Sequence, residues 1–186
     1  MNSIKQIEVI YNNRLVGRLA LTREGLCAFE YSAEWLSSGF SISPFELPLR
    51  SGVFIAKPRP FEGGFGVFDD CLPDGWGLLI LDRYLQQKGI NPRTLTLLDR
   101  LALVGSTGRG ALEFRPDNSV VTRQDFADFE KLALEAEKIL ASDDYMGEGI
   151  EEFQDRGGSP GGARPKIFVR YNDKEWLVKF RAKRDS

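Results

Sequence analysis

Apolar and polar residues alternate along the N-terminal part of the chain. The alternation runs through residues 7–11, 15–21 and 27–31, with an Asn-Asn pair and an Arg-Glu-Gly segment between the runs. A period of two is typical of strands with one buried face, and these interruptions favour turns. We therefore expect an antiparallel meander. Ser32 follows it and is placed to cap a short helical turn through Trp35.

Helical periodicity replaces the alternation after residue 65. Leucines at helical spacing predict a helix that starts beyond the Pro-Asp-Gly turn at 73–75 and ends at the Lys-Gly pair at 88–89. A second helix is expected over residues 95–104 and a strand over residues 110–115.

A third helix is indicated by Thr122 and Asp125, which resemble a capping box. Its apolar stripe comprises Phe126, Phe129, Ala133, Ala136 and Leu140. Both phenylalanines of this stripe are therefore expected in the core. Residues 37–64 are rich in Gly, Pro and Ser, which predicts irregular connections with a short strand around residues 53–56.

The C-terminal pattern is that of a β-hairpin. Strand-like runs at 167–171 and 175–181 flank a turn at 172–174. Because an isolated two-stranded hairpin is marginal in water, it either docks on the preceding domain or belongs to the front part of a longer protein. The whole pattern predicts an α+β fold, with a mainly antiparallel sheet and packed helices followed by the beginning of a second lobe.

The composition is that of a folded, soluble chain, and it narrows the possible chemistry. Hydrophobic residues make up 42% and charged residues 28% of the 186 residues. The absence of histidine excludes Ser-His and Cys-His nucleophile pairs and histidine-based zinc sites. Cys27 and Cys71 lie in apolar contexts without a CxxC partner, which predicts buried thiols in a reducing compartment.

Charge is distributed unevenly, although the net charge is only −2. Residues 156–186 carry nine basic and three acidic side chains, whereas residues 143–155 carry six carboxylates and no basic side chain. This asymmetry predicts a domain boundary near residue 150 with a cationic element after it. The acidic run is most simply a solvated connection. Since the sequence shows no signal peptide and no membrane span, the cytoplasm is the expected location.

The glycine-rich segment at 157–162 is the strongest chemical candidate. It has four glycines in six positions, and Arg164 and Lys166 follow it. Glycine amides can converge on an anion, and adjacent cations would neutralise a polyphosphate. The hairpin places Lys179 opposite a residue between 166 and 168, near the exit of this segment. A glycine loop beside a strand lysine is the arrangement of a protein-kinase nucleotide lobe.

A simpler interpretation remains open for each candidate. The glycines suit a linker before an ordinary hairpin, and Lys179 suits a solvated strand lysine. Ser159 is either a loop hydroxyl without a role or a regulatory acceptor. The glycine-rich segment at 105–110 lacks the Gly-Lys-Ser/Thr end of a P-loop and suits a helix end. Dipole stabilisation at a helix N-terminus accounts for three nearby carboxylates, Asp69, Asp70 and Asp74.

Several short phrases occur in order along the chain. They are Phe29-x-Tyr31 with Trp35-Leu36, Ser43 with Leu47-Pro48-Leu49, Leu72-Pro73-Asp74-Gly75, Gly105 with Gly110-Ala111-Leu112, and the segment from Ser159 to Lys166. Together they resemble the HipA family of bacterial toxin kinases, nearly from end to end of the chain.

This resemblance implies two parts. Residues 1–150 would be the N-terminal subdomain that meets an antitoxin, and residues 151–186 would begin the ATP-binding lobe of the kinase. ATP and magnesium would serve the complete parent protein. The implied ATP-binding residues are Gly157, Gly158, Ser159, Gly161, Gly162, Ala163 and Lys179. Ser159 is also the implied autophosphorylation site, where a phosphate would add about two negative charges beside the ATP phosphates.

The resemblance also implies partners. The antitoxin would be a DNA-binding helix-turn-helix protein, so contact with nucleic acid would be indirect. The substrate would be a serine or threonine of a translation component such as an aminoacyl-tRNA synthetase. The family carries its catalytic aspartates and asparagine in a helical lobe that follows the nucleotide lysine, and that lobe is not in these 186 residues.

We therefore expect no catalytic residue, no metal ligand and no phosphoryl transfer in this chain alone. The alternative is a freestanding, non-enzymatic module that binds an antitoxin or restrains a separate kinase.

Overall fold

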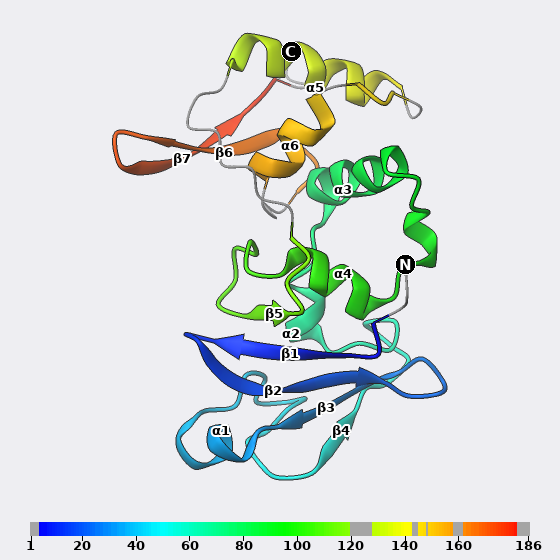
Figure 1. Cartoon of the computed structure of the whole chain (residues 1–186), viewed down its shortest axis with the longest axis vertical. Helices are drawn as coiled ribbons and strands as arrows, with labels where there is room; N and C mark the ends of the chain where they lie inside the picture. The colour runs from blue at the N-terminus through cyan, green and yellow to red at the C-terminus, as the bar shows by residue number, and fades with distance from the viewer. Residues whose placement is uncertain (1–3, 120–127, 143–144, 148, 158–161, 182–186) are drawn as a thin grey trace. The chain divides into compact units, whose positions relative to one another are not determined.

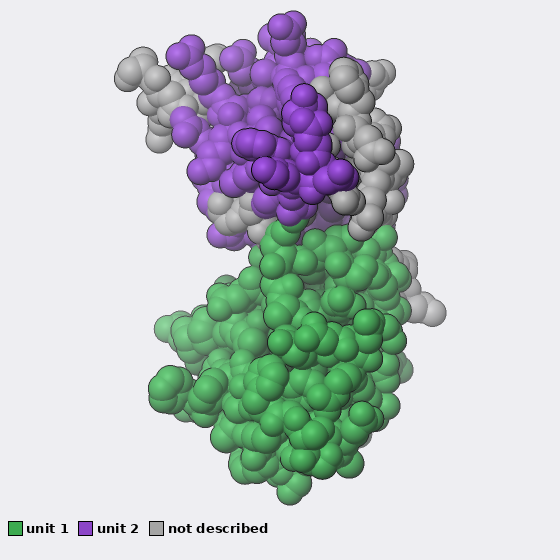
Figure 2. All heavy atoms as spheres, turned by 90° about the vertical axis from the view of Figure 1, so that its left-hand side faces the viewer, with its two compact units in different colours: residues 1–72, 94–119 green, residues 73–93, 120–186 purple. Residues whose placement is uncertain are grey.

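The chain folds into two compact units. The computed structural model describes residues 4–119, 128–142, 145–147, 149–157 and 162–181. Unit 1 comprises residues 1–72 and 94–119, and unit 2 comprises residues 73–93 and 120–186 (Figure 2). Each unit has its own hydrophobic core. The α+β class expected from the sequence is confirmed.

Unit 1 is built on a five-stranded antiparallel sheet with the order β4-β3-β2-β1-β5 (Figure 1). Its strands are β1 (Gln6–Tyr11), β2 (Arg14–Leu21), β3 (Cys27–Tyr31), β4 (Val53–Ile55) and β5 (Glu113–Arg115). Its helices are α1 (Ala33–Ser38), α2 (Gly66–Asp69) and α4 (Leu97–Val104). A 3₁₀ turn, η1 (Pro92–Thr94), precedes α4 and lies where the chain passes from unit 2 back into unit 1. The expected meander, both short strands and the helix before Gly105 are confirmed.

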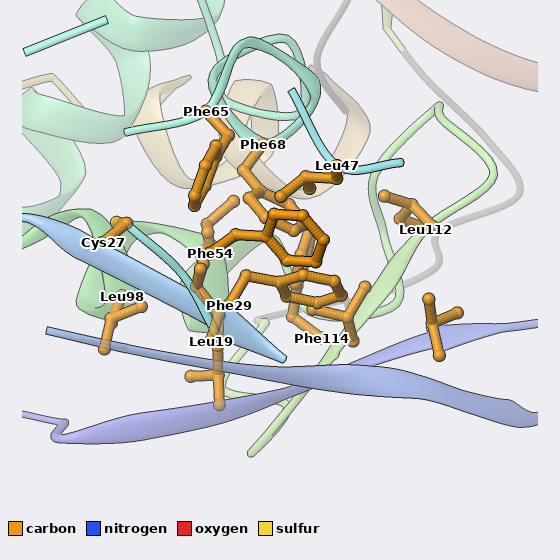
Figure 3. Packing of buried hydrophobic residues seen from close by; sticks show 14 of the residues in the cluster. Leu19, Cys27, Phe29, Leu47, Phe54, Phe65, Phe68, Leu98, Leu112 and Phe114 are labelled. Carbon is orange, nitrogen blue, oxygen red and sulfur yellow. The ribbon is translucent and has the colours of Figure 1, made fainter. Parts of the chain in front are cut away.

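The core of unit 1 is aromatic. Phe29 and Phe68 are fully buried with ring centroids 5.5 Å apart, and Phe114 lies 6.4 Å from Phe68 (Figure 3). Phe54 and Phe65 extend the same cluster above the sheet. The period of two explains this core, because every second residue of each strand faces the same side of the sheet.

The Phe-x-Tyr and Trp phrase of the sequence has a structural explanation. The Tyr31 hydroxyl donates to the carbonyl of Leu47 at 2.6 Å, and the Trp35 indole N–H donates to the carbonyl of Phe40 at 2.9 Å. Ser32 caps α1 as expected, since its hydroxyl accepts from the Trp35 amide at 3.1 Å. These bonds fix the irregular segment between β3 and β4 onto the sheet.

Unit 2 combines three helices with a two-stranded hairpin. The helices are α3 (Gly75–Gln87), α5 (Phe129–Ala141) and α6 (Gly149–Gly157), and the strands are β6 (Lys166–Tyr171) and β7 (Lys174–Lys179). Asn172 and Asp173 form the turn with φ of 51° and 57°, a left-handed backbone that Asn and Asp tolerate. The predicted hairpin is confirmed, and it docks on its own unit through Ile167, Val169 and Phe180.

Edge-to-face rings connect the parts of unit 2. Phe153 of α6 lies 5.1 Å from the Trp76 ring of α3 and 5.8 Å from the Phe180 ring that follows β7, both nearly perpendicular. Arg83 of α3 is buried and donates to the carbonyls of Ile139 and Ser142, each at 2.8 Å. Arg83 thereby donates to carbonyls at the end of α5, for which the helix itself supplies no amide donor.

Two expectations for unit 2 are wrong. The buried stripe of α5 comprises Leu132, Ala136 and Ile139, whereas Phe129 is 47% and Leu140 is 45% exposed. Helical spacing allowed two overlapping stripes, and the one with Leu132 and Ile139 faces the core. Asp128 caps this helix. The expected cap pair, Thr122 and Asp125, lies outside the described residues, and so does Phe126.

The second wrong expectation concerns the acidic run at 143–155. Part of it forms α6 rather than a solvated connection, because Ile150 and Phe153 are three residues apart and share one buried face. The domain boundary that the charge asymmetry predicts near residue 150 stays a prediction; the division into compact units falls at other positions.

Replacing the central ring of unit 2 tests this packing. We expect Phe153→Ala to lower the free energy of unfolding of unit 2 by about 3–5 kcal/mol, because it leaves a large cavity between Trp76 and Phe180. Phe129→Ala, at a half-exposed site in the same unit, is the control and should cost less than about 1 kcal/mol. Urea unfolding measures both, and equal losses would contradict the assignment of the core.

Candidate functional site

The glycine segment begins at the end of α6 and its far end is held at Gly162. Gly157 is the last residue of α6, and Gly158, Ser159 and Gly161 lie outside the described residues. Gly162 has a φ of 93°, a backbone conformation that favours glycine. Ala163 follows and is exposed. Gly162 is thus the residue whose contacts show how the end of the segment is held.

Hydrogen bonds hold the backbone of Gly162 on both sides. Its amide donates to Oδ1 of Asp74 at 3.0 Å. Its carbonyl accepts from the Trp76 amide at 3.1 Å and from the Lys166 ammonium at 3.1 Å. The start of α3 and the start of β6 therefore meet at one peptide unit.

The backbones of Gly75 and Gly162 also touch. A Cβ placed on Gly75 would lie 2.6 Å from the carbonyl carbon of Gly162, and the φ of Gly75 is 43°. Only a glycine at position 75 permits this approach without displacement of the chain. The neighbouring Trp76 is buried, and its indole N–H has no hydrogen-bond partner among the described residues.

Two lysines lie opposite each other on the hairpin, at the exit of the glycine segment. Lys166 of β6 pairs directly with Lys179 of β7, which confirms the register range expected from the sequence. Directly opposed residues of an antiparallel pair face the same side of the sheet. Val178 and Phe180, the neighbours of Lys179, belong to the core cluster of unit 2, so Lys179 faces the opposite side.

Positive charge dominates the surroundings of Lys166. Burial lowers the pKa of the Lys166 ammonium, and the charges of Lys179 and Arg164 lower it further, while the Asp74 carboxylate raises it. Lys166 is 4% exposed, whereas Lys179 is exposed. An anion at this point would stabilise both ammonium groups, because it would offset their mutual repulsion.

Asp74 is a residue beside the glycine segment that the sequence interpretation did not include in the candidate site. The sequence assigned Asp69, Asp70 and Asp74 together to dipole stabilisation. Asp74 does occupy the N-cap position of α3, yet its side chain accepts no bond from that helix and binds Gly162 instead. No sequence signal connects residues that are 88 positions apart; the Pro-Asp-Gly turn marks only the helix start.

Other chemistry is scarce in the described part of the chain. The segment at 105–110 is a helix end followed by the entry to β5, as expected, with Gly105 capping α4 at a φ of 51°. Within the described residues, no group of three or more acidic or cysteine side chains could hold a metal ion, and no helix has the length and hydropathy needed to cross a membrane. Cys27 is buried as expected, but Cys71 is only half-buried.

The protein is thus an α+β protein. One unit is built on a sheet, and the other has a hairpin that packs on helices and carries two directly opposed lysines. Residues 7–115 match the family described as HipA N-terminal domain. This match covers more than half of the chain, and the chain belongs to that family. The match includes β1 except Gln6, β2 to β5 and α1 to α4, and the glycine segment lies beyond it. A comparison with curated proteins finds no match.

The reactivity of the two thiols can be tested chemically. Burial raises the pKa of Cys27 to about 11 and, together with the charge of Asp70, that of Cys71 to about 11. Only about a thousandth of each thiol would be thiolate at pH 8, against roughly a quarter for an unfolded cysteine.

We expect alkylation by iodoacetamide at pH 8 to be roughly a hundredfold slower in the folded chain than in urea. The folded-state rate should keep rising with pH up to about 11. Single Cys27→Ser and Cys71→Ser variants assign the two rates. A thiol that reacts as fast in the folded chain as in urea would contradict the raised thiol pKa.

Proposed function

We propose that residues 151–186 begin the nucleotide-binding lobe of a HipA-like serine/threonine kinase, the toxin component of a toxin–antitoxin pair. The triphosphate of ATP would lie beside Gly162 and the ammonium groups of Lys166 and Lys179. One observation carries this proposal: two lysines are held opposite each other next to a glycine whose backbone is bonded on both sides.

The available groups suit a polyphosphate. Lysine ammonium groups act as point charges toward phosphate oxygens, and backbone amides of a glycine segment add further donors. The proposed ATP-binding residues are Gly157, Gly158, Ser159, Gly161, Gly162, Ala163 and Lys179. ATP and magnesium would serve the complete parent protein, whose further lobe would supply the carboxylates that bind the metal. Ser159 would be the residue that regulates the site by autophosphorylation.

The complete parent kinase would act in the cytoplasm and transfer the γ-phosphate of ATP to a serine or threonine of a translation-related protein, such as an aminoacyl-tRNA synthetase. Its catalytic carboxylates would lie in a further lobe. A helix-turn-helix antitoxin that binds DNA would contact residues 1–150, so contact with nucleic acid would be indirect.

A second candidate function rests on the surface of unit 1. Phe45 is fully exposed, and Val53 and Ile55 of the edge strand β4 are 55% and 61% exposed. Exposed apolar residues on an edge strand favour contact with another protein. This supports a non-enzymatic module that binds an antitoxin or restrains a separate kinase.

Removing the strand lysine tests the nucleotide site. We expect Lys179→Ala to weaken binding of magnesium ATP roughly tenfold or more, because a charge-assisted bond to a phosphate is lost. Lys174→Ala is the matched control, since Lys174 is an exposed lysine at the other end of β7 and should leave the affinity unchanged. Isothermal titration calorimetry measures both; equal affinities of wild type and Lys179→Ala would contradict the site.

The separate expectation about catalysis needs a different assay. We expect this chain to incorporate no radiolabel from γ-labelled ATP into itself or into a protein substrate, because the family resemblance assigns the carboxylates that bind magnesium and activate the hydroxyl to a lobe that follows the nucleotide lysine. Turnover that disappears in Lys179→Ala would contradict this expectation and would place catalytic groups within these 186 residues.

A further inference from the structure

Asp74 stands at a helix start but serves a distant segment. Its backbone is extended, as N-cap residues are, and an N-cap aspartate ordinarily accepts from an amide of its own first turn. Here Oδ1 accepts from the amide of Gly162 at 3.0 Å instead. The carboxylate therefore holds the exit of the glycine segment and leaves the helix start uncapped by its side chain.

The low helix propensity of Gly75 also indicates that the start of α3 serves the glycine segment. Glycine is among the poorest residues for a helix interior or first turn, yet α3 begins with it. The contact with Gly162 explains the choice, because a Cβ at position 75 would lie 2.6 Å from the Gly162 carbonyl carbon. The sequence at the start of α3 thus fits the glycine segment better than it fits the helix.

Gly162 in turn positions a lysine. The Lys166 ammonium donates to the Gly162 carbonyl, which also accepts from the Trp76 amide. Trp76 is buried, so this end of α3 is fixed by the core of unit 2. A connected path therefore runs from Asp74 through the Gly162 peptide groups to Lys166, and Lys166 lies opposite Lys179.

We infer that Asp74 is a positioning residue of the nucleotide site. Its carboxylate fixes Gly162, and through Gly162 it sets where the Lys166 and Lys179 ammonium groups meet the phosphates. This inference rests on the proposed function for its ligand, while the bond from Gly162 to Asp74 is tested independently of nucleotide. The Leu-Pro-Asp-Gly phrase thereby belongs to the same site as the glycine segment.

The experiment measures two quantities in the full chain, which are the exchange rate of the Gly162 amide and the affinity for magnesium ATP. Hydrogen exchange of the Gly162 amide is measured by NMR in wild type, Asp74→Ala and Asp74→Asn, and magnesium ATP affinity is measured in the same three proteins. Asn keeps an acceptor oxygen, and Ala does not. The amide of Ile139, buried inside α5, reports whether unit 2 stays folded. Glu137→Ala, at an exposed carboxylate of α5, is the control variant.

We expect Asp74→Ala to speed exchange at Gly162 and to weaken ATP binding, each about three- to tenfold, with exchange at Ile139 unchanged. Asp74→Asn should restore most of both values, and Glu137→Ala should change neither. Unchanged exchange at Gly162 in Asp74→Ala would overturn the inference, as would faster exchange with undiminished ATP affinity. If wild type binds no ATP, the proposed function and the positioning role both fail, while the exchange rates still decide whether Asp74 holds Gly162.

Discussion

The hydrogen-bonded peptide groups of Gly162 are the interaction on which the site of unit 2 depends. They join the end of the glycine segment and the nearby start of β6 to the start of α3, which is distant in the sequence. The close approach of the two backbones explains glycine at position 75, and a φ of 93° favours glycine at position 162. The aromatic core formed by Trp76, Phe153 and Phe180 fixes the elements that carry these bonds.

The lysine pair is a local conflict within an otherwise consistent unit. Like charges directly opposite each other weaken a pair of strands, and Lys166 in addition is buried. The register cannot shift to separate them, because a slip by one residue would bring Ile167, Val169 and Phe180 out of the core. Conflicts that packing enforces are expected at binding sites, where a ligand of opposite charge relieves them.

Much of the fold could be predicted from residue periodicity. The strands of unit 1, helix α3 and the hairpin follow from spacing, turn residues and caps, which are local signals. The stripe of α5 could not be chosen, because Phe129 and Leu132 lie on overlapping stripes and only the neighbouring elements decide which side is buried. Helix α6 was hidden by its carboxylates, although Ile150 and Phe153 supply its buried face.

The site shows the same limit. Hairpin register placed Lys179 opposite the exit of the glycine segment, since the turn and the strand lengths are local. The partner of Asp74 depends on how α3 packs in unit 2, and no pattern within the chain specifies a contact between residues 74 and 162. The family match supports the assignment of the N-terminal region and lies outside the lysine pair.

Chemical shifts during a titration with magnesium ATP test the central claim most directly. We predict that the amide signals of Gly162, Ala163 and Lys179 shift with ATP and stay unchanged with adenosine, because the proposed site would bind the phosphates. Shifts confined to other surfaces, or equal shifts with adenosine, would contradict it.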